Sequence, residues 1–353
     1  MNRLDEITDA LRTRGIDGIL ISDLTNVRYL SDFRGSSACV LITEKKRLFF
    51  TDFRYEEQAA KQIRGFEICI EKEPRPRLIL EKAKSLGIGT LGFEASASYE
   101  FYRSLLRKGP RIKAITNLVE DLRRVKDAKE TRLIAAAIDR AEKALTDIKP
   151  HIRNGVTELQ IAARLEERLK ERGCAALPFD IIVAAGPRSS MPHARPTAKK
   201  IQAGDLVVVD WGGEADGYFS DMTRTFLVSG GAAEKKREIY DTVLRANLAA
   251  IAAVKSGVRA RLIDKTARGV IQDAGYGDFF GHGTGHGVGL HVHELPRISR
   301  LGRESVKTGM IFTIEPGIYL PGTGGVRIED MVLVRDKGCK VMTSLPKELE
   351  ILH

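Results

Sequence analysis

Apolar and amphipathic stretches alternate along the first third of the chain. The short apolar runs predict strands at residues 18–22, 38–43, 47–52, 66–70, 90–94 and 111–115. The amphipathic stretches predict helices that end at Gly15, cover 54–63 and 98–109, and run from Pro76 to Gly87. Such alternation indicates an α/β fold in which helices cover a mixed sheet. No cluster of reactive side chains accompanies it, so we expect a scaffold or oligomerisation domain.

A long helix is predicted after this region. Asp127 followed by Glu130 has the pattern of a capping box, and an amphipathic stretch continues from there over 128–152. At 353 residues the chain exceeds the usual size of a single core, so two domains are expected. We place the boundary just before the long helix, which gives domains 1–122 and 123–353.

The rest of the chain repeats itself weakly. Residues 155–173 and 257–275 both begin and end with glycine and carry apolar side chains in the same register, which predicts two matching helices. Each is followed by a strand, a glycine-rich turn and a second strand, at 205–228 and 310–334. The C-terminal domain is therefore predicted to be an α+β structure of two pseudo-symmetric halves.

Each of these strand pairs carries two carboxylates within apolar sequence. They are Asp210 and Asp221 in the first pair and Glu315 and Glu329 in the second. A carboxylate embedded in such a strand is unfavourable unless it meets a cation. Four of the seven histidines fall in the stretch GHGTGHGVGLHVHE, at 281–294. Histidine is a poor core residue and a common metal ligand, so this crowding indicates a site.

The four carboxylates and His286 together predict a metal centre. They provide enough donor atoms for two divalent ions about 3.5 to 4 Å apart, the spacing of two-metal hydrolases. An oxygen-rich set of this kind suits manganese, with cobalt or zinc as alternatives. Water between two such ions loses a proton near neutral pH and becomes a nucleophile. We therefore expect two divalent ions per chain and hydrolytic chemistry.

Composition limits the binding partners and the cellular location that are expected. The formal net charge is +10, but basic and acidic residues are interleaved, so no nucleic-acid partner is expected. The four cysteines form no CxxC pair and are predicted to be reduced thiols. No apolar signal segment or bilayer-length run is present, so we expect no membrane partner and a cytoplasmic location. A homodimer is the expected assembly.

The string HGTGHGVGLHVHE, at 282–294, resembles the signature of Xaa-Pro peptidases of the pita-bread metallopeptidase family M24. The segments EPGIYLPGTGGVRIED and VVDWGGEADGYFSDMTRTF are similar to its flanking motifs, and RYLSDFRGSSACVLIT with FFTDFRY resembles its creatinase-type N-terminal domain. The resemblance extends over the whole chain. It implies a C-terminal pita-bread domain with five metal ligands, which are Asp210, Asp221, His286, Glu315 and Glu329. It further implies that Asp221 and Glu329 bridge the ions, while Asp210 serves one ion and His286 and Glu315 the other.

The resemblance also implies roles outside the ligand set. His193 and His293 match histidines that face the substrate, with His293 near the scissile carbonyl oxygen. His282 matches a residue of the proline-side pocket, and Arg327 matches an arginine beside the site. The implied catalytic residues are His193, His282, His293 and Glu315. Trp211 departs from the small apolar residue expected after the first aspartate, so it either narrows the pocket or packs, and the position of His291 is variable.

The expected substrates are small peptides with proline in the second position. Prolidase takes dipeptides and aminopeptidase P takes longer peptides as well, and we favour the dipeptidase because Arg297 could hold the free carboxylate of a dipeptide. The expected substrate-binding residues are thus His193, His282, Arg297 and Arg327. The HGTGH spacing and the extra N-terminal domain argue against methionine aminopeptidase. Creatinase shares the fold without metals, and the intact ligand set argues against it. A catalytically inactive pita-bread binding module would be expected to have lost ligands.

Overall fold

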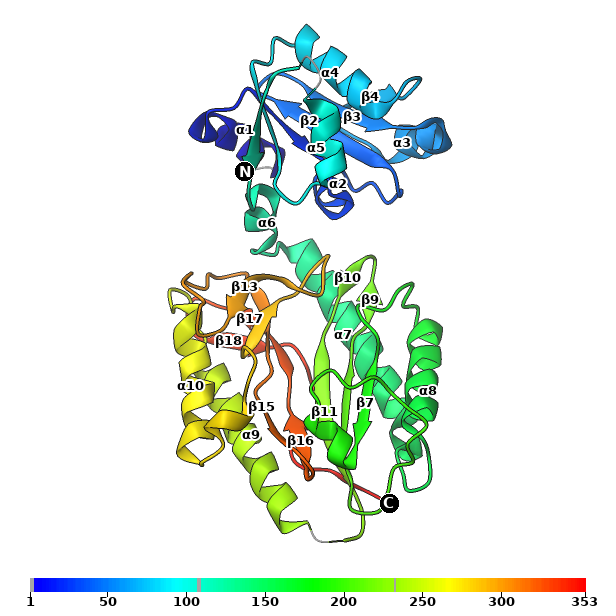
Figure 1. Ribbon diagram of the computed structural model, residues 1–353, viewed down its shortest axis with the longest axis vertical. Coiled ribbons are helices and arrows are strands. Elements are labelled where there is room, and N and C mark those ends of the chain that lie inside the picture. Colours follow the sequence, from blue (N-terminus) through cyan, green and yellow to red (C-terminus); the bar gives the residue numbers. More distant parts are fainter. Residues whose placement is uncertain (1–2, 107–108, 232) are drawn as a thin grey trace. The chain divides into compact units, whose positions relative to one another are not determined.

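The computed structural model describes residues 3–106, 109–231 and 233–353 (Figure 1). Contacts between Cα atoms divide the chain into two compact units, Met1–Arg123 and Arg124–His353. Each unit has its own sheets and its own hydrophobic core, and each is described by itself below.

The N-terminal unit is built on one mixed sheet, as predicted. Its six strands are β1 (Gly18–Ile21), β2 (Ala38–Thr43), β3 (Arg47–Thr51), β4 (Glu67–Ile70), β5 (Thr90–Glu94) and β6 (Arg111–Ile115). They lie in the order β4-β3-β2-β1-β5-β6. The pairs β1–β2 and β2–β3 are antiparallel, and the other pairs are parallel. The strands β1 and β2 are buried along their whole length, which explains their unbroken apolar sequence.

Short helices cover this sheet. They are α1 (Arg3–Arg14), α2 (Leu24–Ser31), α3 (Glu56–Gln62), α4 (Arg75–Ser85), α5 (Tyr99–Leu105) and α6 (Leu118–Arg123), with a 3-10 turn η1 (Phe53–Tyr55). The helices α2 and α6 were not predicted. Helix α4 begins one residue before Pro76, and residues 107–108 of the helix predicted over 98–109 lie outside the described residues.

The first half of the C-terminal unit begins with a helix pair. Its elements are α7 (Ala128–Ile148), η2 (Lys149–His151), α8 (Glu158–Glu171), β7 (Ile182–Ala185), η3 (Gly186–Ser190), β8 (Leu206–Trp211), β9 (Glu214–Ala215), β10 (Tyr218–Phe219) and β11 (Met222–Val228). The predicted capping box of Asp127 and Glu130 is present at the start of α7. The strands β7, β8 and β11 pair antiparallel, and β19 (Ile351–Leu352) extends their sheet.

The second half repeats this plan. Its elements are α9 (Glu234–Ala253), α10 (Ala260–Asp273), η4 (Gly277–Phe279), β12 (Gly285–Gly287), β13 (Glu294–Ile298), β14 (Ile311–Ile314), β15 (Gly317–Leu320), β16 (Gly324–Arg327), β17 (Asp330–Val334) and β18 (Cys339–Val341). The helices α8 and α10 both have 14 residues, and β12, β14 and β17 pair antiparallel as β7, β8 and β11 do. Within this unit, α8 and the pair α9–α10 flank the two sheets on opposite sides (Figure 1). The prediction of two pseudo-symmetric halves is confirmed.

Two further features were expected from composition. All four cysteines are free thiols. Across the described ranges, no helix is both long enough and apolar enough to cross a bilayer.

Candidate metal centre

The carboxylates of the two halves converge where their hairpins meet. Asp210 lies on β8 opposite Thr223 of β11, and Asp221 directly precedes β11. Thr223 also forms an isolated bridge with Glu329, which directly precedes β17. The Thr223 hydroxyl donates a hydrogen bond of 2.7 Å to Glu329 Oε2. One threonine thus joins the Asp210–Asp221 hairpin to the acidic residue of the other half.

His286 completes the cluster from β12. Its Nε2 lies 3.5 Å from Asp221 Oδ2 and 3.5 Å from Glu315 Oε1. Its Nδ1 bonds to the carbonyl oxygen of Gly287 at 3.1 Å, which assigns the proton to Nδ1 and leaves the Nε2 lone pair facing the carboxylates. Asp221, His286 and Glu329 each offer a ligand atom within 4.8 Å of the others. Such an arrangement is suited to holding a metal ion.

Asp210 has an oxygen that no protein group satisfies. Its Oδ2 accepts a hydrogen bond of 2.5 Å from Arg327 Nη2, while its Oδ1 is buried and has no partner among the described residues. Buried polar atoms in proteins almost always have a partner. An unpartnered carboxylate oxygen beside other carboxylates is therefore suited to bind a cation.

The electrostatics of the carboxylate cluster also indicate a cation site. Burial raises the pKa of Asp221 well above its ordinary value, and the negative charges of Glu329, Asp210 and Glu315 raise it further. Burial likewise raises the pKa of Glu329, and Glu315 and Asp210 add to this effect. Divalent cations would relieve the repulsion and keep the carboxylates ionised. A donor set of carboxylates with one imidazole fits a divalent cation.

Removal of metal should destabilise the C-terminal unit. The carboxylates would then repel one another, and the binding free energy that favours the folded state would be lost. We expect chelator-treated protein to melt at a lower temperature than metal-loaded protein in differential scanning calorimetry, and re-addition of manganese to reverse the change. An unchanged melting temperature would contradict the site. In the Asp221→Asn variant, which keeps fewer ligand charges, the difference should be smaller.

His282 and Arg327 are connected by a tyrosine that the sequence analysis missed. The Tyr319 hydroxyl lies 2.8 Å from His282 Nε2 and accepts a hydrogen bond of 3.0 Å from Arg327 Nη1. Arg327 Nε donates to the Thr223 hydroxyl at 3.0 Å. The ring of Phe280 meets the His282 ring edge-on at a centroid distance of 5.0 Å. The sequence did contain a signal for Tyr319, which lies in a Gly- and Pro-rich hairpin shortly after the predicted metal ligand Glu315. A buried Tyr hydroxyl usually finds a hydrogen-bond partner.

The other two predicted histidines lie at the margin of the cluster. His293 is exposed, and its ring centroid is 4.4 Å from that of His286. His193 is also exposed and follows Pro192, whose carbonyl accepts a hydrogen bond of 3.3 Å from Arg327 Nη1. Both histidines therefore belong to segments that contact the metal-centre residues.

Arg297 lies on β13 opposite His286 of β12. Opposite residues of an antiparallel pair direct their side chains to the same face, although a bulge follows His286 here. The Arg297 side chain is exposed, and within the described part of the chain no hydrogen bond or ion pair engages its guanidinium. It is thus available to a ligand.

Trp211 does not narrow the site. It is fully buried, and its Nε1 donates a hydrogen bond of 2.9 Å to the carbonyl oxygen of Ala141 on α7. Successive residues of a strand point to opposite faces, so Trp211 faces the helices while Asp210 faces the carboxylates. The sequence allowed two roles for Trp211, narrowing the pocket or packing, and the structure favours packing.

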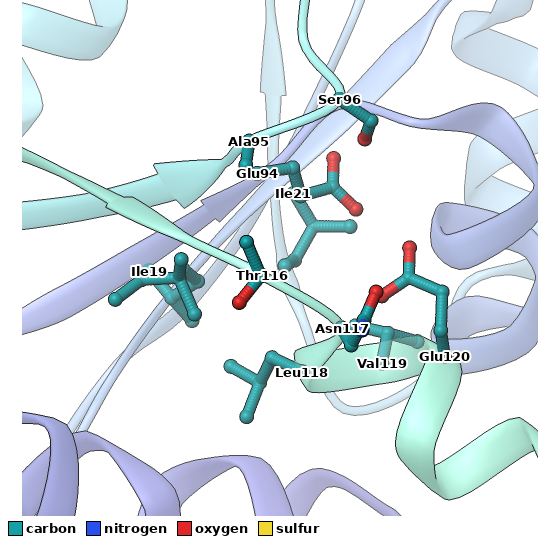
Figure 2. A pocket seen from close by; sticks show the side chains of 11 residues that line it. Ile19, Ile21, Glu94, Ala95, Ser96, Thr116, Asn117, Leu118, Val119 and Glu120 are labelled. Atoms are coloured by element: carbon teal, nitrogen blue, oxygen red, sulfur yellow. The ribbon is translucent and has the colours of Figure 1, made fainter. Parts of the chain in front are cut away.

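The N-terminal unit has a small cavity of about 80 Å³ at the carboxyl ends of β1, β5 and β6. Figure 2 shows the carboxylates of Glu94 and Glu120 on one side of it and the apolar side chains of Ile19 and Leu118 on the other. Asn26 Nδ2 donates to both carboxylates at 2.7 Å, and Glu94 also accepts from the backbone of Ser22 and Asp23. These carboxylates are already engaged by protein donors, which fits a structural role.

Comparisons with known proteins point to a family of metallopeptidases. The model of metallopeptidase family M24 matches residues 132–336, and that of the creatinase/prolidase N-terminal domain matches residues 3–125. The chain is 38% identical to a Xaa-Pro dipeptidase of Pyrococcus horikoshii over 98% of each chain. It is similar in structure to a Xaa-Pro dipeptidase from Bacillus anthracis, with a TM-score of 0.97, 40% identity and 99% of each chain covered. It is also similar to an X-Pro aminopeptidase from Thermotoga maritima, with a TM-score of 0.90, 35% identity and 100% of each chain covered.

Proposed function

The chain belongs to metallopeptidase family M24, and from this membership we propose that it hydrolyses the bond between an N-terminal residue and a following proline. The observation that carries the proposal is the buried carboxylate cluster with an imidazole, which has an unsatisfied oxygen on Asp210. Two divalent ions would be held there, with Asp221 and Glu329 as bridging ligands, Asp210 on one ion, and His286 and Glu315 on the other. Manganese is the proposed ion, with cobalt or zinc as alternatives.

When bound, the ions would supply Lewis-acid polarisation of the scissile carbonyl and activation of water at neutral pH. Side chains of the protein would provide the hydrogen bonding, proton transfer and orientation. His293 would donate a hydrogen bond to the oxygen on which negative charge develops, and Glu315 would pass a proton to the leaving proline nitrogen. Arg327 fixes the orientation of Asp210 and of the Tyr319 hydroxyl through direct hydrogen bonds.

The environment of His282 suits the proline side of the substrate. Phe280 and Tyr319 pack against the His282 ring, so the imidazole is surrounded by aromatic surface. Proline offers a hydrophobic ring and no N–H, and therefore needs apolar contact more than a hydrogen-bond acceptor. His193 is proposed to contact substrate from the neighbouring loop.

Dipeptides are the proposed preferred substrates, and an aminopeptidase that accepts longer peptides is the second candidate. The second candidate is supported by the likeness to the X-Pro aminopeptidase of Thermotoga maritima. Manganese-loaded protein should hydrolyse Ala-Pro faster than Ala-Pro-Ala and leave Ala-Ala largely intact, as measured by release of free alanine. Strong preference for Ala-Pro-Ala would favour the second candidate, and no hydrolysis of either proline peptide would refute the proposed function.

Arg297→Ala should separate the two substrates. A dipeptide ends in a carboxylate where a longer peptide has a neutral amide, and a charge-assisted hydrogen bond to that carboxylate contributes about 1.5 to 3 kcal/mol. We expect kcat/KM for Ala-Pro to fall by roughly 10- to 100-fold, with a much smaller change for Ala-Pro-Ala. Arg303→Ala, a change to another arginine of the same unit, provides the control. Equal losses on both peptides would remove Arg297 from the substrate site.

The location and assembly are proposals as well. Four free thiols suit a reducing compartment, which supports a cytoplasmic location. The homodimer stays a prediction.

A further inference from the structure

A buried ion pair ties the loop that carries His293 to the segment before α7. Lys126 Nζ lies 3.1 Å from Glu294 Oε2, and the two side chains are only 1% and 7% exposed. Glu294 directly follows His293 and is the first residue of β13. Removing one partner of a buried ion pair is strongly destabilising, so the two side chains hold each other in place.

The Glu294 carboxylate also fixes the loop between β12 and β13 from inside. Its Oε1 accepts a hydrogen bond of 3.0 Å from the backbone of His291. A Cβ atom at Gly289 would lie 2.7 Å from Glu294 Oε2, so glycine leaves room for the carboxylate. Gly289 N donates to the carbonyl of His291 at 2.9 Å, and Phe219 N donates to the carbonyl of Gly289 at 2.8 Å. The loop is thus folded around the carboxylate of Glu294.

The backbone at Lys126 and at both neighbouring residues is fixed by contacts of its own. Its backbone N–H donates to the carbonyl of Gly309 at 2.9 Å, and Val125 bridges to Met310. Asp127, the next residue, caps α7. Because the backbone around Lys126 is fixed in this way, its ammonium group offers Glu294 a fixed partner.

We propose that Lys126 is a positioning residue for His293 and acts through Glu294. The inference rests on the proposed function, because it requires His293 to act on the substrate. With the ammonium present, the carboxylate stays bonded to His291 and the loop keeps the His293 ring beside His286. Without it, the buried carboxylate turns toward water, its bond to the His291 backbone is lost, and the His293 ring leaves its position.

A double-mutant cycle tests this role. Lys126→Met keeps most of the aliphatic stem and removes the charge. We expect it to lower kcat for Ala-Pro by roughly 10- to 100-fold while KM and metal content stay near wild type. In a His293→Ala background the same substitution should change kcat by less than about twofold, because nothing remains to be positioned. An equal loss in both backgrounds, or no loss in either, would overturn the proposal.

Matched variants distinguish the positioning role of Lys126 from a general structural effect of the substitution. Lys149→Met removes a lysine of the same unit that pairs with Glu350 at 2.6 Å, and it should leave kcat at the wild-type value. Lys126→Arg keeps the charge and should recover most of the rate. If Lys126→Met does not fold, Glu294→Gln takes its place in the cycle with the same expectations. An inactive wild-type protein would refute the proposed function, whereas an active wild type with fully active Lys126→Met and Glu294→Gln variants would refute this inference alone.

Discussion

Asp221→Asn and Glu329→Gln should each abolish hydrolysis of Ala-Pro and lower the metal content to at most one ion per chain. Each of these carboxylates is proposed to serve both ions, so its loss affects the whole centre. An amide of the same shape has no negative charge and presents N–H donors toward the cations. Both residues are buried, at 5% and 2% exposure, so water can replace the lost ligand only poorly.

Metal content by elemental analysis and turnover of Ala-Pro on the same sample provide the measurement. Asp216→Asn is a matched control, because Asp216 lies in the β9–β10 turn of the same hairpin at φ 52°, a conformation that Asn tolerates. This variant should keep wild-type turnover and two bound ions. Near-normal turnover with two ions in Asp221→Asn or Glu329→Gln would refute the ligand assignment.

The stability of the metal-free variants shows whether inactivity reflects misfolding. In the metal-free wild type, burial and neighbouring carboxylates raise the pKa values of Asp221 and Glu329, so their ionised forms are unfavourable in the folded state. Replacing one carboxylate by an amide removes part of this repulsion. Metal-free Asp221→Asn should therefore melt at the same or a higher temperature than metal-free wild type.

The strands that carry the ligands could be predicted because their sequence signal is local. Buried apolar residues of β8 and β11 flank Asp210 and Asp221, and glycines mark the turn between the strands. The bridge from Thr223 to Glu329 is different, since it joins residues 106 positions apart through a hydroxyl and a carboxylate. Nothing in the periodicity of either strand indicates that pair.

Helix α2 shows why some elements escaped prediction. It has only 8 residues, including a valine and an aromatic residue, and only Ser22 separates its N-cap Asp23 from β1. Val27, Tyr29 and Leu30 are buried, but so short a stretch does not establish a helical period. Tertiary packing, rather than local preference, decides its structure.

Side-chain networks were the least predictable part of the site. Lys126 and Glu294 are 168 positions apart, and each alone has the pattern of an ordinary surface charge. Tyr319 reaches His282 across 37 positions. Such contacts depend on how segments far apart in the sequence pack together, and a single sequence does not indicate which of these residues will pair.

His293→Ala should reduce kcat by about 10²- to 10³-fold, the usual cost of losing one donor to a developing oxyanion, and leave the metal content unchanged. The geometry supports a role outside the ligand set, because Asp221, His286 and Glu329 lie close enough to share one ion, and the exposed residue His293 lies beside His286. Turnover of Ala-Pro and elemental analysis of one sample test both parts. His291→Ala, an exposed histidine of the same loop, should keep wild-type turnover. If metal content falls in step with kcat, His293 is a ligand rather than a donor to the substrate.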